Sequence, residues 1–226
     1  MRIAEIFQSI QGEGEFAGTP SVFVRTTGCN LRCWFCDTPY TSFRPEGPRR
    51  LWTDVLDEIL KFDCTHVVLT GGEPMLQPEM VPLARTLREQ GRIVTMETAG
   101  TIFRPVDVDL MSISPKLSNA APREETHWQE RHERDRDRPE AMQKLLEGST
   151  YQLKFVVDQP EDLQEIVAYL ARFPQIPQDR IWLMPQGIRQ EELLEKGVWL
   201  APAAAELGFR FCPRRHIEMF GNVRGT

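Results

Sequence analysis

The sequence predicts an α/β fold in which parallel β-strands form a sheet covered by α-helices. Short apolar strand-like runs alternate with amphipathic helical segments about six times along the chain. In addition, residues suited to ligand binding follow the carboxyl ends of the strands, where such folds place their sites: Cys29, Gly71, Thr98, Pro115 and Pro185. The sheet is expected to be a full or partial barrel or a doubly wound sheet, and periodicity does not separate these.

The alternating elements can be placed by residue number. The predicted strands are residues 21–26, 67–70, 93–97, 109–114, 151–157 and 181–185, with 209–212 as a further short strand. The predicted helices are residues 53–62, 79–90 and 160–173, followed by helical sequence that ends at Leu207. Thr53 is expected to cap the first helix, and Gly91 to end the second.

Composition and charge narrow the class of protein. The chain has 226 residues, 41% hydrophobic and 27% charged, which suits a single soluble domain over residues 1–226. A net charge of −6 argues against broad nucleic-acid binding, which needs an excess of Lys and Arg. No apolar stretch approaches the ~20 residues of a membrane span, and the N-terminus lacks a signal-peptide core. We therefore expect no membrane association and a cytoplasmic location, where cysteines stay reduced.

One segment interrupts the alternation. Residues 117–150 are too long for an ordinary connection, and residues 123–138 carry five arginines against six Asp and Glu. We interpret the segment as a variable insertion within the domain. A solvated helix or mobile loop is favoured over a lid or partner-docking element.

Residues 28–37 hold three of the five cysteines, Cys29, Cys33 and Cys36, at C-x3-C-x2-C spacing. Thiolates are soft ligands that select zinc, copper(I) or an iron–sulfur cluster. Three ligands where four are usual indicate a metal centre with one position open for chemistry. A structural zinc site would need a fourth ligand nearby, but the nearest histidine is His66. We favour a catalytic metal or cluster over structural zinc and over unliganded thiols.

The spacing resembles the signature of the radical S-adenosylmethionine (SAM) superfamily, in which three cysteines hold a 4Fe–4S cluster and the fourth iron binds SAM. The resemblance implies this role for the three cysteines and a partial (β6/α) TIM-like barrel with small elaborations. The Gly-Gly-Glu-Pro turn at residues 71–74 is by itself a tight strand–helix turn. It resembles the superfamily motif that binds the SAM amino group, which implies that Gly72 binds SAM with support from Glu73.

Two further positions are expected to contact SAM. Ser114, Pro115 and Lys116 could simply end a strand, but related enzymes hold the SAM ribose and carboxylate there, and a lysine suits a carboxylate. Lys154 lies inside a predicted strand, where a buried ammonium must face solvent or meet an anion. We favour the anion and include Lys154 with the SAM-binding residues.

The N-terminal sequence narrows the resemblance. Residues 7–14, Phe-Gln-Ser-Ile-Gln-Gly-Glu-Gly, could form a simple surface hairpin. Together with Cys-Asp-Thr at the third cysteine, Glu-Thr-Ala-Gly-Thr at 97–101 and Ser-Pro-Lys at 114–116, they resemble the 7-carboxy-7-deazaguanine synthase family. Matches recur at Lys154, at residues 185–186 and in the tail at 216–225.

The resemblance implies a lyase that converts 6-carboxy-5,6,7,8-tetrahydropterin to 7-carboxy-7-deazaguanine with loss of ammonia, on the route to queuosine and related tRNA deazapurines. A 5′-deoxyadenosyl radical would take hydrogen from C6 of the pterin, and SAM would be regenerated. The implied partners are Mg²⁺, a flavodoxin- or ferredoxin-type electron donor and a second copy in a homodimer. The implied pterin-binding residues are Ile10, Gln11, Gly12, Glu13, Arg25 and Thr70, with Thr38 as the Mg²⁺ ligand.

Two rival functions remain. A glycyl-radical activase shares the cysteine loop and the Gly-Gly-Glu-Pro turn, but would not need the N-terminal turn, Arg25 and Thr38 together. A non-enzymatic zinc-binding module would explain the cysteines alone. No role follows from the sequence for residues 119–150 or for any one tail residue such as His216.

Overall fold

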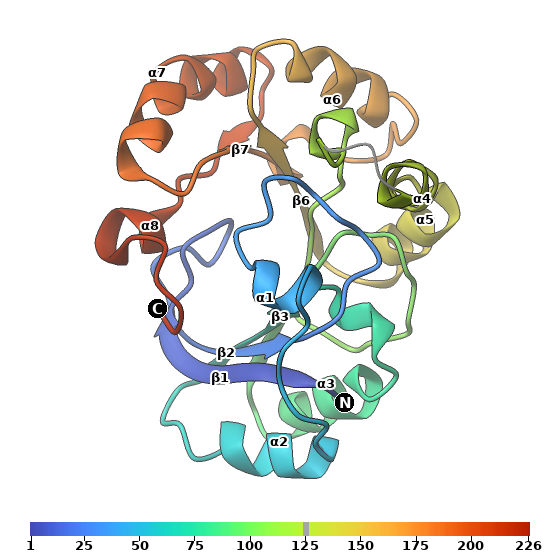
Figure 1. The fold of residues 1–226 in the computed structure, drawn as a ribbon, viewed down its shortest axis with the longest axis vertical. Coiled ribbons are helices and arrows are strands. Elements are labelled where there is room, and N and C mark those ends of the chain that lie inside the picture. Colours follow the sequence, from blue (N-terminus) through green and yellow to red (C-terminus); the bar gives the residue numbers. More distant parts are fainter. Residues whose placement is uncertain (124–126) are drawn as a thin grey trace.

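The chain folds into one curved sheet with helices on its outside (Figure 1). The computed structural model describes residues 1–123 and 127–226. Within them, eight strands are hydrogen-bonded in sequence order: β1 (Ile3–Ile10), β2 (Pro20–Thr26), β3 (His66–Gly71), β4 (Ile93–Thr98), β5 (Leu110–Ile113), β6 (Tyr151–Val157), β7 (Ile181–Pro185) and β8 (Arg210–Phe211). β1 pairs antiparallel with β2, and every later pair is parallel.

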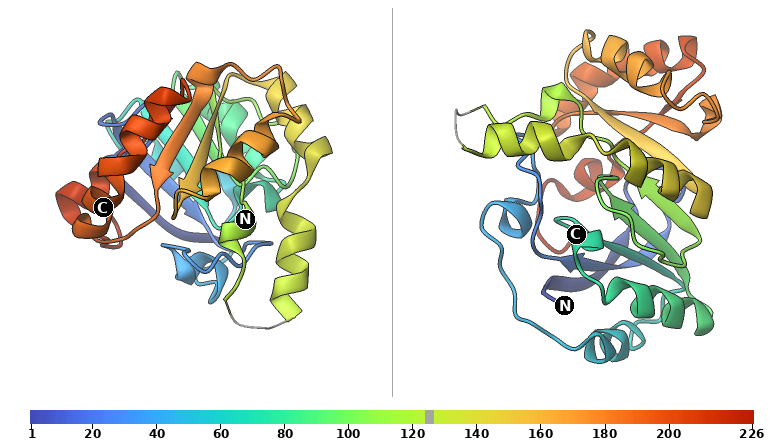
Figure 2. Two further views of the ribbon diagram at one scale, coloured as in Figure 1. Left: turned by 90° about the horizontal axis from the view of Figure 1, so that it is seen from above. Right: turned by 90° about the vertical axis from the view of Figure 1, so that its right-hand side faces the viewer.

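Helices connect the parallel strands, and one more helix follows β8. They are α1 (Pro39–Ser42), α2 (Trp52–Ile59), α3 (Met80–Glu89), α4 (His127–Arg136), α5 (Pro139–Gly148), α6 (Asp162–Leu170), α7 (Gln190–Glu206) and α8 (Arg215–Phe220). Short 3-10 turns are η1 (Pro74–Leu76), η2 (Ser118–Ala120) and η3 (Gln178–Arg180). Figure 2 shows the sheet curving between α2 and α3 at one end and α6 and α7 at the other.

The strand order identifies the architecture. A doubly wound sheet reverses its strand order at a switch point, whereas here the order runs from β1 to β8 without reversal. β1 and β8 are the two edges of the sheet and do not pair with each other, so the barrel is open. The expectation of a partial barrel is confirmed.

The core lies between the sheet and its helices. Val67, Val68 and Leu69 of β3 have no exposed surface, as expected for a central parallel strand. Cys64 and Cys212 are also buried.

β1 was not predicted. Its residues are mostly half-buried on both faces, so the sequence lacks the alternation of apolar and polar residues that marks a strand. The strand forms because residues 3–10 pair antiparallel along β2. The sheet is therefore parallel only from β2 onward.

Two helix boundaries test the capping predictions. Thr53 was wrongly placed as a cap: α2 begins at Trp52 after Leu51, whose side chain makes no capping bond. Gly91 does follow the end of α3, where its φ of 76° would strain any residue with a side chain.

The segment at 117–150 is more regular than expected. It contains η2, α4 and α5, while residues 124–126 of the predicted charged stretch lie outside the described ranges. α5 follows β5 and precedes β6 in the chain. It buries Met142, Leu145 and Leu146 in the main core. The interpretation of the whole segment as a solvated helix or mobile loop was wrong for α5, because α5 buries apolar side chains. The dense charge of the residues before α5 obscured this apolar pattern in the sequence.

None of the helices in the described ranges combines the length and apolar character that a bilayer span requires.

Candidate active site

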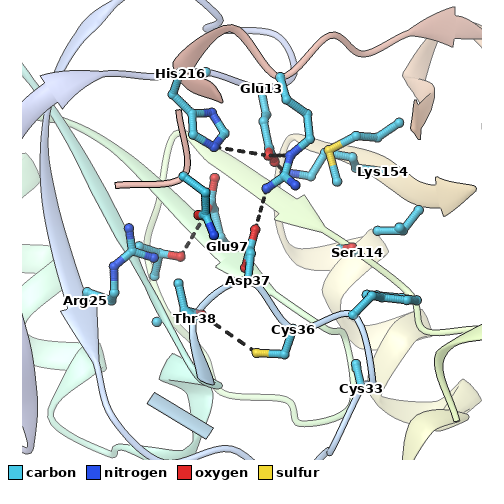
Figure 3. A pocket seen from close by; sticks show the side chains of 18 of the residues that line it. Glu13, Arg25, Cys33, Cys36, Asp37, Thr38, Glu97, Ser114, Lys154 and His216 are labelled. Carbon is cyan, nitrogen blue, oxygen red and sulfur yellow. Dashed lines mark hydrogen bonds and ion pairs between the residues drawn. The ribbon is translucent and has the colours of Figure 1, made fainter. Parts of the chain in front are cut away.

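A cavity of about 470 Å³ opens at the carboxyl ends of the parallel strands (Figure 3). The turn after β1, the cysteine loop after β2, the ends of β3 to β7 and the C-terminal tail all line it. Of the predicted site residues, those that line the cavity are Ile10, Gln11, Gly12, Glu13, Arg25, Cys29, Cys33, Cys36, Thr38, Thr70, Gly72, Ser114, Lys116 and Lys154. The two remaining predicted residues, Glu73 and Pro115, are buried behind this lining.

The turn after β1 approaches its neighbours so closely that it requires glycine. A Cβ on Gly12 would lie 1.9 Å from Nδ1 of His216, and a Cβ on Gly14 would lie 2.2 Å from Nε2 of Gln152. Gly14 also has a φ of 71°, which disfavours other residues. The glycines therefore let the turn pack against β6 and the C-terminal segment while it presents Gln11 and Glu13.

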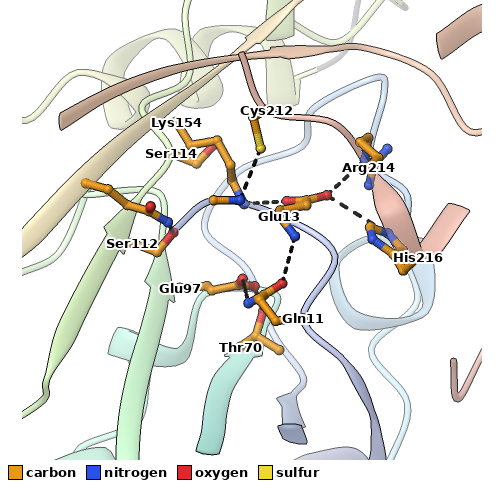
Figure 4. A network of polar contacts seen from close by, with 12 residues as sticks. Gln11, Glu13, Thr70, Glu97, Ser112, Ser114, Lys154, Cys212, Arg214 and His216 are labelled. Carbon is orange, nitrogen blue, oxygen red and sulfur yellow. Dashed lines mark hydrogen bonds and ion pairs between the residues drawn. The ribbon is translucent and has the colours of Figure 1, made fainter. Parts of the chain in front are cut away.

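Glu13 is the centre of a charged network (Figure 4). Lys154 Nζ contacts one carboxylate oxygen, and Arg214 Nε lies 2.9 Å from the other. Burial would raise the pKa of Glu13, but the charges of Lys154 and Arg214 outweigh it and hold the pKa well below 4.5. Lys154 therefore meets an anion, as favoured from the sequence, and that anion is Glu13.

Glu97 places a second carboxylate in the cavity. It accepts hydrogen bonds from Gln11 Nε2 at 3.1 Å and from Thr70 Oγ1 at 2.7 Å. These bonds join the turn after β1 to the ends of β3 and β4. The cavity thus presents amide, hydroxyl and carboxylate groups side by side, a set suited to a flat polar ligand.

The cysteine loop also lines the cavity. Cys29, Cys33 and Cys36 are free thiols. Burial raises the pKa values of Cys29 and Cys33 to about 12, so these two are protonated at neutral pH. Cys36 Sγ lies 3.2 Å from Ser42 Oγ. Across residues 1–123 and 127–226, no three His, Cys, Asp or Glu side chains lie close enough together to hold a single metal ion.

Two glycines bring the loops after β2 and β3 together. Gly28 has a φ of 103°, and its carbonyl accepts the Glu73 N–H at 2.9 Å. A Cβ on Gly72 would lie 2.2 Å from that same carbonyl oxygen, so only glycine fits. The Gly-Gly-Glu-Pro turn and the cysteine loop are therefore one packed unit.

Glu73 supports this unit from behind. It has no exposed surface and accepts hydrogen bonds from Met75 N at 3.0 Å, Ala99 N at 2.8 Å and Thr98 Oγ1. Burial raises the pKa of Glu73. Its carboxylate is saturated by the protein, which favours a supporting role rather than direct contact with a ligand.

Arg25 and Thr38 lie on the side of the cavity near β1. Arg25 Nε pairs with Glu5 Oε1 at 2.8 Å, and Tyr40 donates to that same oxygen at 2.6 Å. Thr38 Oγ1 accepts from Thr41 Oγ1 at 3.3 Å. Both side chains are anchored at the cavity wall.

Comparison with known proteins decides the family. Residues 23–147 match the model of the radical SAM superfamily. The chain is 46% identical to the 7-carboxy-7-deazaguanine synthase of Rhodopirellula baltica over 99% of the chain and 88% of that protein. It is 41% identical to the synthase of that name from Halobacterium salinarum, over 99% and 92%. The chain belongs to the 7-carboxy-7-deazaguanine synthase family.

Solved structures agree with this assignment. The crystal structure of QueE from Escherichia coli superposes with a TM-score of 0.65 at 25% identity, covering 95% of this chain and 94% of that one. TYW1 with a bound lysine–pyruvate adduct gives a TM-score of 0.55 at 14% identity, covering 82% and 73%. The second match supports the fold alone.

Membership of a radical SAM family implies a 4Fe–4S cluster and SAM. The side chains that line the cavity are of the kind that these two groups need. Three free thiols on one short loop line the cavity beside the glycine turn. Lys116 and Arg32 add positive charge that lowers the pKa values of Cys33 and Cys29, respectively, against the effect of burial. A bound metal would complete the deprotonation, because thiolates are the ligands.

Ser114 and Lys116, two of the strand-end residues expected at SAM, are hydrogen-bonded to each other. Lys116 Nζ donates to the carbonyl of Ser114 at 2.9 Å and to its hydroxyl at 2.5 Å. Both residues line the cavity, whereas Pro115 between them is buried.

Several cavity residues were not assigned a role from the sequence: Asp37, Glu97, Arg214 and His216. The sequence could have indicated two of them. Glu97 lies at the carboxyl end of a predicted strand, and Asp37 directly follows Cys36. His216 begins the tail segment that resembles the family, but that resemblance assigned it no role. Arg214 had no signal, because its partner Glu13 lies 201 positions away in the chain.

Proposed function

We propose that this chain converts 6-carboxy-5,6,7,8-tetrahydropterin to 7-carboxy-7-deazaguanine with loss of ammonia, on the route to queuosine. The supporting observation is that one cavity is lined by the cysteine loop, by the glycine turn and by the polar turn after β1. A radical source and a binding surface for a flat heterocycle therefore share one space, as a radical rearrangement of a small ring requires.

Three cysteines would hold the cluster, and the cluster with SAM would supply a carbon radical that takes hydrogen from C6 of the pterin. We propose that Gly72, Ser114, Pro115 and Lys116 form the SAM site. The absence of a side chain at Gly72 lets backbone groups approach an amino group, and the Lys116 ammonium suits a carboxylate. Lys154 is proposed to add positive charge to the SAM site while it holds Glu13.

The pterin would lie on the turn after β1. Ile10, Gln11, Gly12 and Glu13 offer backbone and side-chain groups to its edge, and Thr70 offers a hydroxyl. Arg25 uses Nε for Glu5, and its terminal nitrogens are the donors proposed for the substrate carboxylate.

Thr38 is proposed as a Mg²⁺ ligand together with that carboxylate. Magnesium takes hard oxygen ligands and keeps several waters, so one protein hydroxyl suffices. We also propose a flavodoxin- or ferredoxin-type electron donor, a homodimer and a cytoplasmic location.

The test is anaerobic turnover of the reconstituted protein with SAM, a reductant and the carboxytetrahydropterin. We expect the deazaguanine chromophore to appear with ammonia while SAM is not consumed. If the rate of 5′-deoxyadenosine formation does not respond to the carboxytetrahydropterin, the proposal is contradicted and a glycyl-radical activase is favoured. An iron-free protein that binds zinc and has no visible absorbance would also contradict it.

A further inference from the structure

Arg214 joins three parts of the cavity wall that are far apart in the sequence. It lies between β8 and α8, and its guanidinium makes three contacts in different directions. Nε donates to Glu13 at 2.9 Å, Nη1 donates to the Gly187 carbonyl at 2.6 Å, and Nη2 donates to Asp37. One side chain thus holds the turn after β1, the loop after β7 and the cysteine loop.

The network around Arg214 is balanced in charge and mostly buried, with Asp37 as its exposed member at 38%. The Arg214 side chain is 6% exposed, and that of Lys154 is 7% exposed. Their two positive charges face the carboxylates of Glu13 and Asp37. Figure 4 shows Lys154 and Arg214 approaching Glu13 from opposite sides. Such a buried set holds its geometry because moving one member leaves a charge without its partner.

The two carboxylates have different neighbours in the chain. Glu13 belongs to the turn proposed to bind the pterin, whereas Asp37 directly follows Cys36, proposed to bind the cluster. The backbone reinforces the first link, since Arg215 N donates to the Gly12 carbonyl at 3.0 Å. Arg214 therefore spans from the substrate side to the cluster side.

We infer that Arg214 is a positioning residue that fixes the pterin-binding turn relative to the cysteine loop. This inference rests on the proposed function of the cavity. Hydrogen transfer needs the reacting atoms about 3–3.5 Å apart, and a misplacement of about 1 Å costs roughly a hundredfold in rate. A planar guanidinium can bond both carboxylates in fixed directions, whereas a lysine ammonium is a point charge without that fork.

The main experiment compares the parent with Arg214→Lys and Asp37→Asn. Arg214→Lys keeps the buried positive charge, and Asp37→Asn removes only one contact, so both are chosen to preserve the fold. The control is Arg189→Gln, which removes an exposed pair with Glu192 in the loop before α7. Each protein is assayed for 5′-deoxyadenosine and for deazaguanine.

We expect both variants to form the deazaguanine at least tenfold more slowly and to release more deoxyadenosine per product, because the radical forms without its target in place. The double variant should be little worse than Arg214→Lys alone, since both break one link. An unchanged ratio of deoxyadenosine to product, with the rate lowered only in proportion to lost folded protein, would overturn the inference.

A second measurement does not depend on turnover. In the cluster-free protein, alkylation of Cys36 by iodoacetamide, followed by mass spectrometry, reports how firmly the cysteine loop is held. We expect Arg214→Lys to speed this alkylation several-fold and Arg189→Gln to leave it unchanged; equal rates in all three proteins would overturn the inference. A parent that makes no deazaguanine would instead contradict the proposed function, and the alkylation rates would still decide whether Arg214 holds the loop.

Discussion

Two buried carboxylates in and behind the cavity wall, Glu13 and Glu73, have pKa values shifted in opposite directions. Glu73 accepts from neutral donors, and burial raises its pKa. Glu13 is also buried, but it contacts two cations, which hold its pKa well below the usual value. The first is a structural acceptor that tolerates protonation, whereas the second must stay charged to keep its cations paired.

Replacement of Glu13 by Gln should therefore change how stability depends on pH. Because the folded-state pKa is lowered, the unfolded chain binds the proton more readily, and Glu13 stabilises the fold above pH 4.5 and loses that effect as pH falls. We expect Glu13→Gln to cost about 3 kcal/mol at neutral pH, because it leaves buried Lys154 without its carboxylate partner and Arg214 with Asp37 alone. In thermal unfolding, the gap from the parent should narrow as pH falls below 4.5. Glu147→Gln, at an exposed position, should change neither the stability at neutral pH nor its dependence on pH. A stability difference between Glu13→Gln and the parent that stays constant with pH would contradict the role of the Glu13 charge.

Cys33 offers a test at a single thiol. Cys33→Ala should remove iron and visible absorbance from the reconstituted protein while circular dichroism stays that of the parent, because Cys33 packs in a small cluster apart from the main core. Cys64→Ala is the matched control, since Cys64 is buried in the main core and should leave the iron content unchanged. Iron retained at the parent level in Cys33→Ala would refute the ligand assignment.

Among the elements, α4 has a function that its charged sequence conceals. His132 has no exposed surface, and its Nδ1 accepts the backbone N–H of Arg32 at 3.2 Å. The Arg32 guanidinium carbon lies 3.8 Å from the ring centre of Trp128. η2 adds a contact on the same loop, because the Asn119 carbonyl accepts Trp34 Nε1 at 2.7 Å. Together α4 and η2 cover the cysteine loop and hold its backbone.

Replacing His132 by Ala should loosen this cover. The Arg32 N–H would lose its acceptor in a buried place, so we expect a loss of about 2 kcal/mol in the free energy of unfolding. His127→Ala, an exposed change on the same helix, should stay within about 0.5 kcal/mol. Denaturant unfolding at neutral pH compares them.

Acidification supplies a second check on His132. Burial lowers its pKa to about 4, so the unfolded chain binds more protons between that value and 6.5. The stabilisation by neutral His132 is thus full above pH 6.5 and is lost as pH falls toward 4. The difference between the parent and His132→Ala should shrink over that range, and a difference that grows would contradict a neutral buried imidazole.

The elements that the sequence predicted best are those with a local signal. β6 and β7 were predicted with their observed bounds, because apolar and β-branched runs define a central strand without help from the rest of the chain. β1 is an edge strand that forms by pairing with β2, so its own sequence carries little strand signal. α5 was not predicted because the residues just before it are densely charged.

The same distinction explains the site. Thr70 and Ser114 were named from the family resemblance, and both line the cavity because parallel strands bring their carboxyl ends together. Arg214 was missed because its contact with Glu13 spans 201 positions in the chain and leaves no pattern in the sequence around it.

At the scale of the whole molecule, β1 and the C-terminal tail meet across the open side of the barrel. β1 and β8 form the unpaired edges, and Figure 1 shows α8 and the C-terminus beside β1. Arg224 pairs with Glu5 at 3.2 Å and with Glu46 at 2.9 Å, and the tail lines the cavity. The contacts between the chain ends thus complete the cavity wall that an open sheet leaves unfinished.

Gly12→Ala tests that closure. The added Cβ would lie 1.9 Å from His216 Nδ1, so the C-terminal segment must move or the turn must distort, at a cost of about 1–3 kcal/mol. We expect a lower melting temperature and faster proteolysis of the tail, with partial recovery in Gly12→Ala combined with His216→Ala. Gly148→Ala, at the end of α5 with open space around it, should be neutral or slightly stabilising. A tail as protected in Gly12→Ala as in the parent would mean that the chain ends are held together independently of this close approach.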